Sequence, residues 1–76
     1  MYFVLVYDRR ARGILVRRQY IRERRDEALR ERERLVLEYR EAADIEVVLL
    51  GADSFEDLKK THARYFESAE QLTAPR

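Results

Sequence analysis

The chain has 76 residues, a formal net charge of +1, one histidine and no cysteine. This length suits one domain and not two, so residues 1–76 are expected to form a single small α+β domain whose C-terminal tail frays from about residue 70. The composition excludes disulfides, thiolate metal sites and histidine-rich metal clusters.

The longest apolar run, residues 2–7, is far shorter than the roughly 20 residues that span a bilayer. It has no basic segment before it and no small-residue cleavage site after it, so it does not have the pattern of a signal peptide. We therefore expect a cytoplasmic protein with no membrane partner.

The charges are distributed unevenly along the chain. Residues 1–25 hold eight arginines and two acids, a net charge of +6, whereas residues 26–76 hold eight bases and 13 acids, a net charge of −5. Such asymmetry indicates either a site for a polyanion or electrostatic contacts between copies of the chain. Arginine makes up 14 of the 16 basic residues, which is typical of a GC-rich bacterial genome and weakens a functional interpretation of any single arginine.

Residues 1–7 predict a strand with two apolar faces, on which Tyr2, Val4 and Val6 alternate with Phe3, Leu5 and Tyr7. Residues 8–13 are polar and close with a glycine, so they predict a hairpin loop. Residues 14–20 form the returning strand, which is more polar and therefore suits the edge of a sheet.

Residues 21–43 are rich in Glu, Arg, Leu and Ala and predict a long amphipathic helix, with Leu37 on its polar side. Residues 44–52 predict a third strand that is again apolar on both faces. A last helix then starts at one of two capping boxes, Asp53 with Glu56 or Ser54 with Asp57. Its apolar stripe runs from Phe55 to Ala69.

The predicted order is β-β-α-β-α. The strand at residues 1–7 is the most apolar, so it should be central, in a three-stranded sheet of order 2-1-3. We expect both helices to pack on one face of this sheet. The residues expected to be most buried are Phe3, Leu5, Leu35, Tyr39, Leu49, Leu58 and Phe66.

A sheet with both helices on one face would expose its second apolar face, and soluble monomers rarely tolerate such a patch. The sequence therefore predicts a homodimer or a higher symmetric oligomer, formed either by the open face or by continuation of the sheet at the edge of the third strand. The candidate interface residues are Tyr2, Val4, Val6, Val48, Leu50 and Leu37.

The arginines of the hairpin are a candidate nucleic-acid site, because a two-stranded ribbon with arginines at its tip can contact phosphates or enter a groove. Tyr7 and Tyr20 lie near enough to stack on bases. The alternative is a solvated loop and a charged edge that blocks sheet-to-sheet aggregation, and the near-zero net charge favours it. The candidate residues are Arg9, Arg10, Arg12, Arg17, Arg18 and Arg22.

Acidic residues at strand ends are the only pattern with a likeness to catalysis. Asp8 and Asp44 would share one end of the sheet, as in metal-dependent nucleases, but turn formation explains both residues more simply. His62 has the chemistry of a general base, but it lies on an apolar stripe where a core histidine is the simpler interpretation. No nucleophile–base pair, phosphate loop or zinc spacing is present, so neither a catalytic residue nor a cofactor or metal is predicted.

The sequence thus leads to three hypotheses in order. The first is a small non-catalytic module that associates with itself. The second is a nucleic-acid-binding module that uses the arginine-rich hairpin. The third is an enzyme resembling a metal-dependent nuclease.

Overall fold

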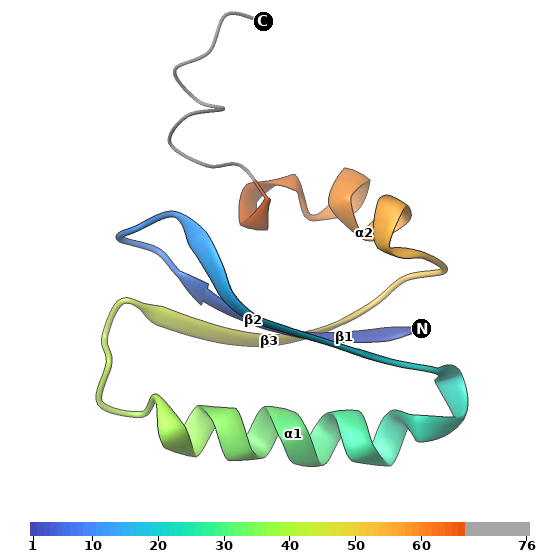
Figure 1. Ribbon diagram of the computed structural model, residues 1–76, viewed down its shortest axis with the longest axis horizontal. Helices are drawn as coiled ribbons and strands as arrows, with labels where there is room; N and C mark the ends of the chain where they lie inside the picture. The colour runs from blue at the N-terminus through green and yellow to red at the C-terminus, as the bar shows by residue number, and fades with distance from the viewer. Residues whose placement is uncertain (67–76) are drawn as a thin grey trace, which may run out of the picture.

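A computed structural model of the chain describes residues 1–66. Ala69 and the tail from about residue 70 lie outside the described residues. The expected order of strands and helices is confirmed, with a short 3₁₀ turn before α1 and another after α2 (Figure 1). The elements are β1 (Tyr2–Asp8), β2 (Gly13–Tyr20), η1 (Arg22–Arg24), α1 (Arg25–Glu38), β3 (Ile45–Gly51), α2 (Phe55–Thr61) and η2 (Ala63–Tyr65).

The three strands form one antiparallel sheet in the order β2-β1-β3, which confirms the predicted 2-1-3 order. Residues 3–7 of the central strand β1 are buried, because β1 has a strand on each side and a helix on each face. In β3, every residue from Ile45 to Leu50 is only half-buried, because β3 lies at an edge of the sheet.

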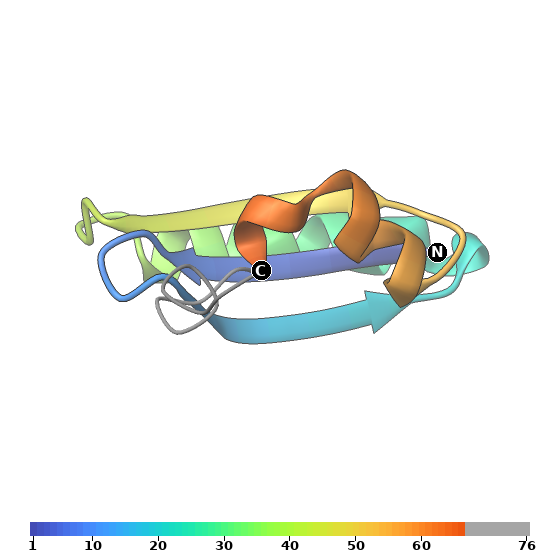
Figure 2. The same ribbon diagram turned by 90° about the horizontal axis from the view of Figure 1, so that it is seen from above.

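The prediction that both helices pack on one face of the sheet is wrong. The sheet lies between α1 and α2, with one helix on each face (Figures 1 and 2). The alternation of β1 is the physical reason, because successive side chains point to opposite faces and both faces need cover. Val4 and Val6 pack beneath α1 with Ala28 and Leu35, whereas Phe3, Leu5 and Tyr7 pack beneath α2 with Leu58 and Tyr65.

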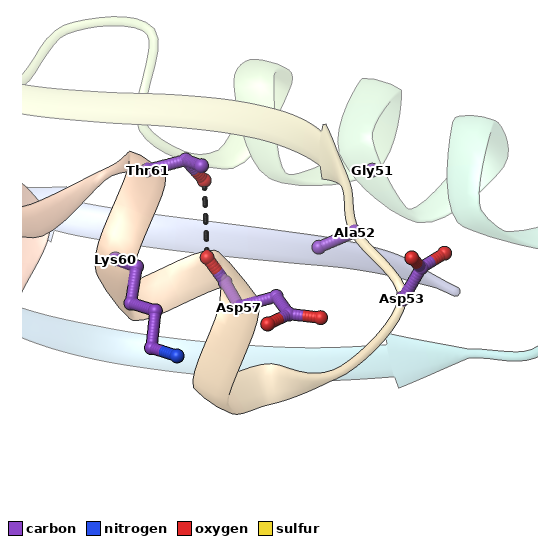
Figure 3. Close-up of a pocket in the computed structure, with 6 residues that line it drawn as sticks. All are labelled: Gly51, Ala52, Asp53, Asp57, Lys60 and Thr61. Atoms are coloured by element: carbon purple, nitrogen blue, oxygen red, sulfur yellow. Dashed lines mark hydrogen bonds between the residues drawn. The ribbon is translucent and has the colours of Figure 1, made fainter.

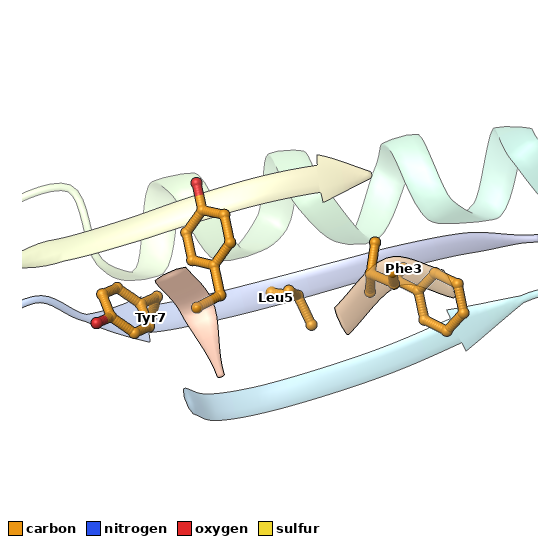
Figure 4. Close-up of a cluster of buried hydrophobic side chains, with 5 residues drawn as sticks. Phe3, Leu5 and Tyr7 are labelled. Atoms are coloured by element: carbon orange, nitrogen blue, oxygen red, sulfur yellow. The ribbon is translucent and has the colours of Figure 1, made fainter. Parts of the chain in front are cut away.

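The core therefore consists of two thin layers, of which the α2 layer is drawn in Figure 4. Of the residues expected to be most buried, Phe3, Leu5, Leu35 and Leu58 are at most 1% exposed. The other three, Leu49, Tyr39 and Phe66, are only half-buried and lie around the rims of the two layers.

This arrangement removes the reason for a dimer built on an open sheet face. Val4 and Val6, two of the candidate interface residues, are fully buried within the chain. Tyr2 packs into the layer under α1, and Val48 and Leu50 pack into the layer under α2. Of the six candidates only Leu37 stays well exposed, on the outer side of α1.

Helix α1 is shorter than the expected span of residues 21–43. Its 14 residues are about 21 Å long, close to the roughly 23 Å of a seven-residue strand. A helix that continued to residue 43 would run past the sheet, and the chain must turn back in time to start β3. Two backbone hydrogen bonds make that turn, from Ala42 N–H to the Tyr39 carbonyl and from Ile45 N–H to the Ala42 carbonyl.

Of the two candidate caps, Ser54 is the N-cap of α2, and its hydroxyl accepts the Asp57 N–H at 3.1 Å. Only three residues, 52–54, separate β3 from α2. This short connection delivers α2 to the face of the sheet opposite α1.

The β-hairpin turn is organised by Asp8. Its carboxylate accepts the backbone N–H groups of Arg10 and Ala11 at 2.9 and 3.0 Å, and its carbonyl accepts the N–H of Arg12 at 2.7 Å. The residue with left-handed backbone is Arg12, with φ of 59°, rather than the neighbouring Gly13. An L-residue other than glycine is strained in this conformation.

Replacing Arg12 by glycine should therefore stabilise the protein. The strain energy that glycine removes from the folded state is larger than the stability lost because glycine raises the entropy of the unfolded chain. The free energy of unfolding should therefore rise by about 0.5–1 kcal/mol. Urea denaturation measures this change. The matched control is Arg10→Gly, which relieves no positive φ and should lower stability; a gain of equal size in both variants would contradict the explanation.

Candidate functional site

The candidate arginines do not form one surface. Arg9, Arg10 and Arg12 are exposed at the hairpin tip, where the Arg9 guanidinium donates to the Ala43 carbonyl. Arg10 and Arg12 make no ion pair with any residue in the range 1–66. Arg22 follows β2 at the opposite end of the sheet, about 20 Å from the tip by strand length.

Arg17 and Arg18 point to opposite faces, as neighbours on a strand must. The Arg17 guanidinium lies over the ring of Phe55 on the α2 side, 4.2 Å from the ring centroid. The Arg18 guanidinium lies 3.6 Å from the Glu31 carboxylate on the α1 side. Both arginines therefore already have partners within the chain.

The two tyrosines near the hairpin are also engaged within the fold. Tyr7 is 6% exposed and packs edge-on against Tyr65, with 5.3 Å between ring centroids. Tyr20 is half-buried in the layer beneath α1, where burial, and next the charge of Glu31, raise the pKa of its phenol. Within residues 1–66, the candidate arginines that are exposed and make neither an ion pair nor a side-chain hydrogen bond are Arg10 and Arg12 at the tip and Arg22 at the opposite end of the sheet.

The acidic pair Asp8 and Asp44 lies at one end of the sheet, as the topology predicts. The N–H of Arg9 donates to the Asp44 carbonyl at 2.9 Å, which joins the two turns. The Asp8 carboxylate is used by the hairpin turn. Across residues 1–66 no group of three or more His, Asp or Glu side chains is placed to hold a metal ion.

A polar cluster that the sequence did not predict lies between β3 and η2. The Glu46 carboxylate accepts hydrogen bonds from the Tyr65 hydroxyl at 2.6 Å and from the Arg64 guanidinium at 2.7 Å. Burial, and next the hydrogen bond to Glu46, raise the pKa of the Tyr65 phenol. The only signal in the sequence was Glu46 itself, the one acid in an apolar strand. The cluster anchors η2 to β3 and neutralises the charge of Glu46.

Figure 3 shows a shallow, open depression of about 340 Å³ at the connection from β3 to α2. Along its α2 wall the Thr61 hydroxyl donates to the Asp57 carbonyl one turn earlier in the helix, at 3.2 Å. The side chains of Lys60, Asp53 and Asp57 do not converge on a common point. The depression therefore lacks the enclosed, convergent geometry of a small-molecule site.

The outer edge of β3 presents unpaired backbone groups. Met1 and Ala52 exchange two backbone hydrogen bonds, and Arg9 N–H donates to the Asp44 carbonyl, so the even-numbered residues of β3 bond to β1. The odd-numbered residues therefore direct their N–H and C=O groups outward. Within residues 1–66 the outward groups of Val47, Leu49 and Gly51 have no hydrogen-bond partner.

The two edges of the sheet differ in how they are protected. β2 carries Arg17, Arg18 and Gln19 and has a bulge opposite Val6 and Tyr7, features that discourage strand pairing. β3 has neither proline nor lysine and no register shift against β1. Its one acid, Glu46, is compensated within the chain. The β3 edge is thus an unprotected apolar edge.

An apolar flank of α1 adjoins this edge. A groove of about 310 Å³ separates α1 from β3, and Val36, which lines it, is 40% exposed. Its lining residues are Val36, Tyr39, Arg40, Ala42, Ala43, Ile45 and Val47. We call the outer edge of β3 together with this groove the β3–α1 surface.

The opposite flank of α1, next to β2, carries a network of ion pairs. Glu31 binds Arg34 at 2.8 Å and Arg18 at 3.6 Å, and Arg34 also binds Glu38 at 2.9 Å. The hydrogen bond from Arg34 is the main reason that the pKa of Glu31 is lowered. The β3 flank of α1 thus carries the exposed Val36, whereas its β2 flank is covered by charged side chains.

Comparison of the chain with protein-family models, with curated proteins and with solved structures finds no match. No helix within residues 1–66 is long and apolar enough to cross a membrane. The function must therefore be argued from the surfaces themselves.

Proposed function

We propose that this protein is a non-catalytic interaction module that associates with itself through the β3–α1 surface. The observation that carries this proposal is the contrast between the two sheet edges: β2 is charged and bulged, whereas β3 is apolar, regular and unpaired. A sheet edge that is apolar, regular and unpaired, like that of β3, is a template for pairing with another strand.

The small size of the chain supports the same proposal. A domain of about 76 residues buries only roughly 60% of the surface of its unfolded chain and is marginally stable alone. Pairing at β3 would extend the sheet and bury the half-exposed apolar residues along it, and any partner that binds only the folded state stabilises that state.

Sedimentation equilibrium at micromolar concentration tests the proposal. The expected mass is about twice the 9.2 kDa of the chain. The variant Val47→Pro should be monomeric, because proline removes an outward N–H and leaves the hydrogen bonds between β1 and β3 in place.

The matched control is Gln19→Pro, which removes an outward N–H from the β2 edge. Gln19 is paired with Phe3, whose backbone groups bond to β3 rather than to β2. This variant should remain a dimer. A monomeric parent would refute the proposal, and equal dissociation of both proline variants would show that strain in the sheet, rather than the β3 edge, is responsible.

The alternative is a nucleic-acid-binding module, which one observation favours: Arg10 and Arg12 are exposed at the hairpin tip without an acidic partner in residues 1–66. A gel-shift series over salt distinguishes it, because phosphate contacts give an affinity that falls steeply as salt rises. Retention of DNA or RNA at low salt that is lost in the triple variant Arg9→Ala, Arg10→Ala, Arg12→Ala would support this function. The absence of any retention by the parent would exclude it.

A further inference from the structure

The backbone of β3 limits how a second copy can pair with it. Its outward groups belong to Ile45, Val47, Leu49 and Gly51. In an antiparallel ladder, a residue whose backbone N–H and C=O point toward the partner strand must lie opposite a residue that does the same, so that the two exchange hydrogen bonds. The side chains of two opposed residues lie on the same face of the sheet. A two-fold axis must then pass through a residue of β3, and an axis at Val48 pairs the whole strand, residues 45–51.

We infer, building on the proposed function, that a second copy of this chain pairs its β3 antiparallel about a two-fold axis at Val48. Val47 then lies opposite Leu49 of the other copy, and Glu46 lies opposite Leu50 rather than opposite the second Glu46. The Ile45 N–H is already bonded to the Ala42 carbonyl, which leaves about six backbone hydrogen bonds between the copies. The product is a continuous six-stranded sheet with both α1 helices on one face and both α2 helices on the other.

The same axis brings the two α1 helices side by side. α1 runs antiparallel to β3 (Figure 1), and Val36 lines the same groove as Ile45 and Val47. The axis at Val48 is about 7 Å further along β3, which corresponds to between four and five residues back along α1, at the level of Glu31 and Arg32. The two α1 helices therefore run antiparallel to each other on either side of the axis.

The symmetry of β3 explains why a second copy fits this edge. Each residue with outward backbone groups meets another such residue, and the single acid of each strand meets a leucine rather than the second acid. Val36, which is 40% exposed, lies on the flank of α1 beside this edge. The edge is self-complementary in hydrogen bonding, as a two-fold interface requires.

Disulfide trapping tests the register, and the absence of cysteine gives a clean background. Residues 46, 48 and 50 form non-hydrogen-bonded pairs in this ladder, with Cα atoms about 4.5 Å apart, within the range that a disulfide bridges. In a glutathione redox buffer, with oxidised glutathione as oxidant, Val48→Cys alone should form covalent dimers. Glu46→Cys and Leu50→Cys should cross-link only when the two are mixed. Arg18→Cys, on the β2 edge, is the matched control and should stay monomeric on a non-reducing gel.

Each outcome decides between registers. Cross-links between Glu46→Cys and Val48→Cys would move the axis to Val47, and those between Val48→Cys and Leu50→Cys would move it to Leu49; either result overturns the inference. A parent that is dimeric by sedimentation while none of these pairs cross-links would overturn the register and leave the proposed self-association standing. A monomeric parent would refute both the register and the proposed self-association.

Discussion

Replacement of Leu35 by alanine should lower the free energy of unfolding by about 2–5 kcal/mol, the range for truncating a buried leucine. Leu35 is 1% exposed and is the largest α1 side chain packed on the sheet, against Val4 and Val6. The cavity cannot collapse readily, because the strand beneath it is also held by the layer under α2. Urea denaturation at a fixed protein concentration measures the loss; the concentration must be fixed because self-association contributes to stability.

Two other leucine truncations, at an exposed and at a half-buried position, serve as comparisons for Leu35→Ala. Leu37→Ala removes a side chain that is 61% exposed on the same helix and should change stability by less than about 0.5 kcal/mol. Leu49→Ala removes a half-buried side chain at the sheet edge and should cost about 1–2 kcal/mol, less than at the fully buried site. If Leu35→Ala unfolded at the same urea concentration as Leu37→Ala, α1 would not be packed on β1 as described.

The sheet could be predicted from the sequence, but the side on which each helix lies could not. The alternation in residues 1–7 reports two apolar faces, and that identifies β1 as the central strand. It does not report what covers each face, because the apolar stripes of α1 and α2 are chemically alike. The choice is made by the three-residue connection from β3 to α2 and by the Ser54 cap, which direct α2 across the edge of the sheet.

The candidate surface was predictable in part. The two apolar faces of residues 44–52 predict self-association, with continuation of the sheet at the edge of β3 as one of its two modes. The flank of α1 was not predictable, because Val36 lies beside Ile45 only if the helix ends at Glu38 instead of residue 43. The separation of Arg17 from Arg18 was implicit in strand geometry, since consecutive residues point to opposite faces.

Leu58 is as important for the layer under α2 as Leu35 is for the layer under α1, since Leu58 is the only fully buried residue of α2. A helix of seven residues is too short to be stable by itself, so α2 depends on its packing against the sheet. Phe55 and Tyr65 assist at either end, through ring contacts with Phe3 and Tyr7. Removing the central side chain therefore weakens the attachment of the whole segment.

Leu58→Ala should cost about 2–5 kcal/mol and should release residues 55–65 before the rest of the fold. Hydrogen exchange measures this order: amides of α2 should lose protection while those of β1 and α1 keep theirs. The released segment uncovers Phe3, Leu5 and Tyr7, so the variant should also aggregate. Adding Val47→Pro to Leu58→Ala should not prevent this aggregation, because the uncovered surface is a sheet face and not the β3 edge. Lys60→Ala, an exposed change on the same helix, is the control and should behave like the parent. Uniform loss of protection across α1 and α2 would mean that the two layers unfold as one unit and that α2 is not separately attached.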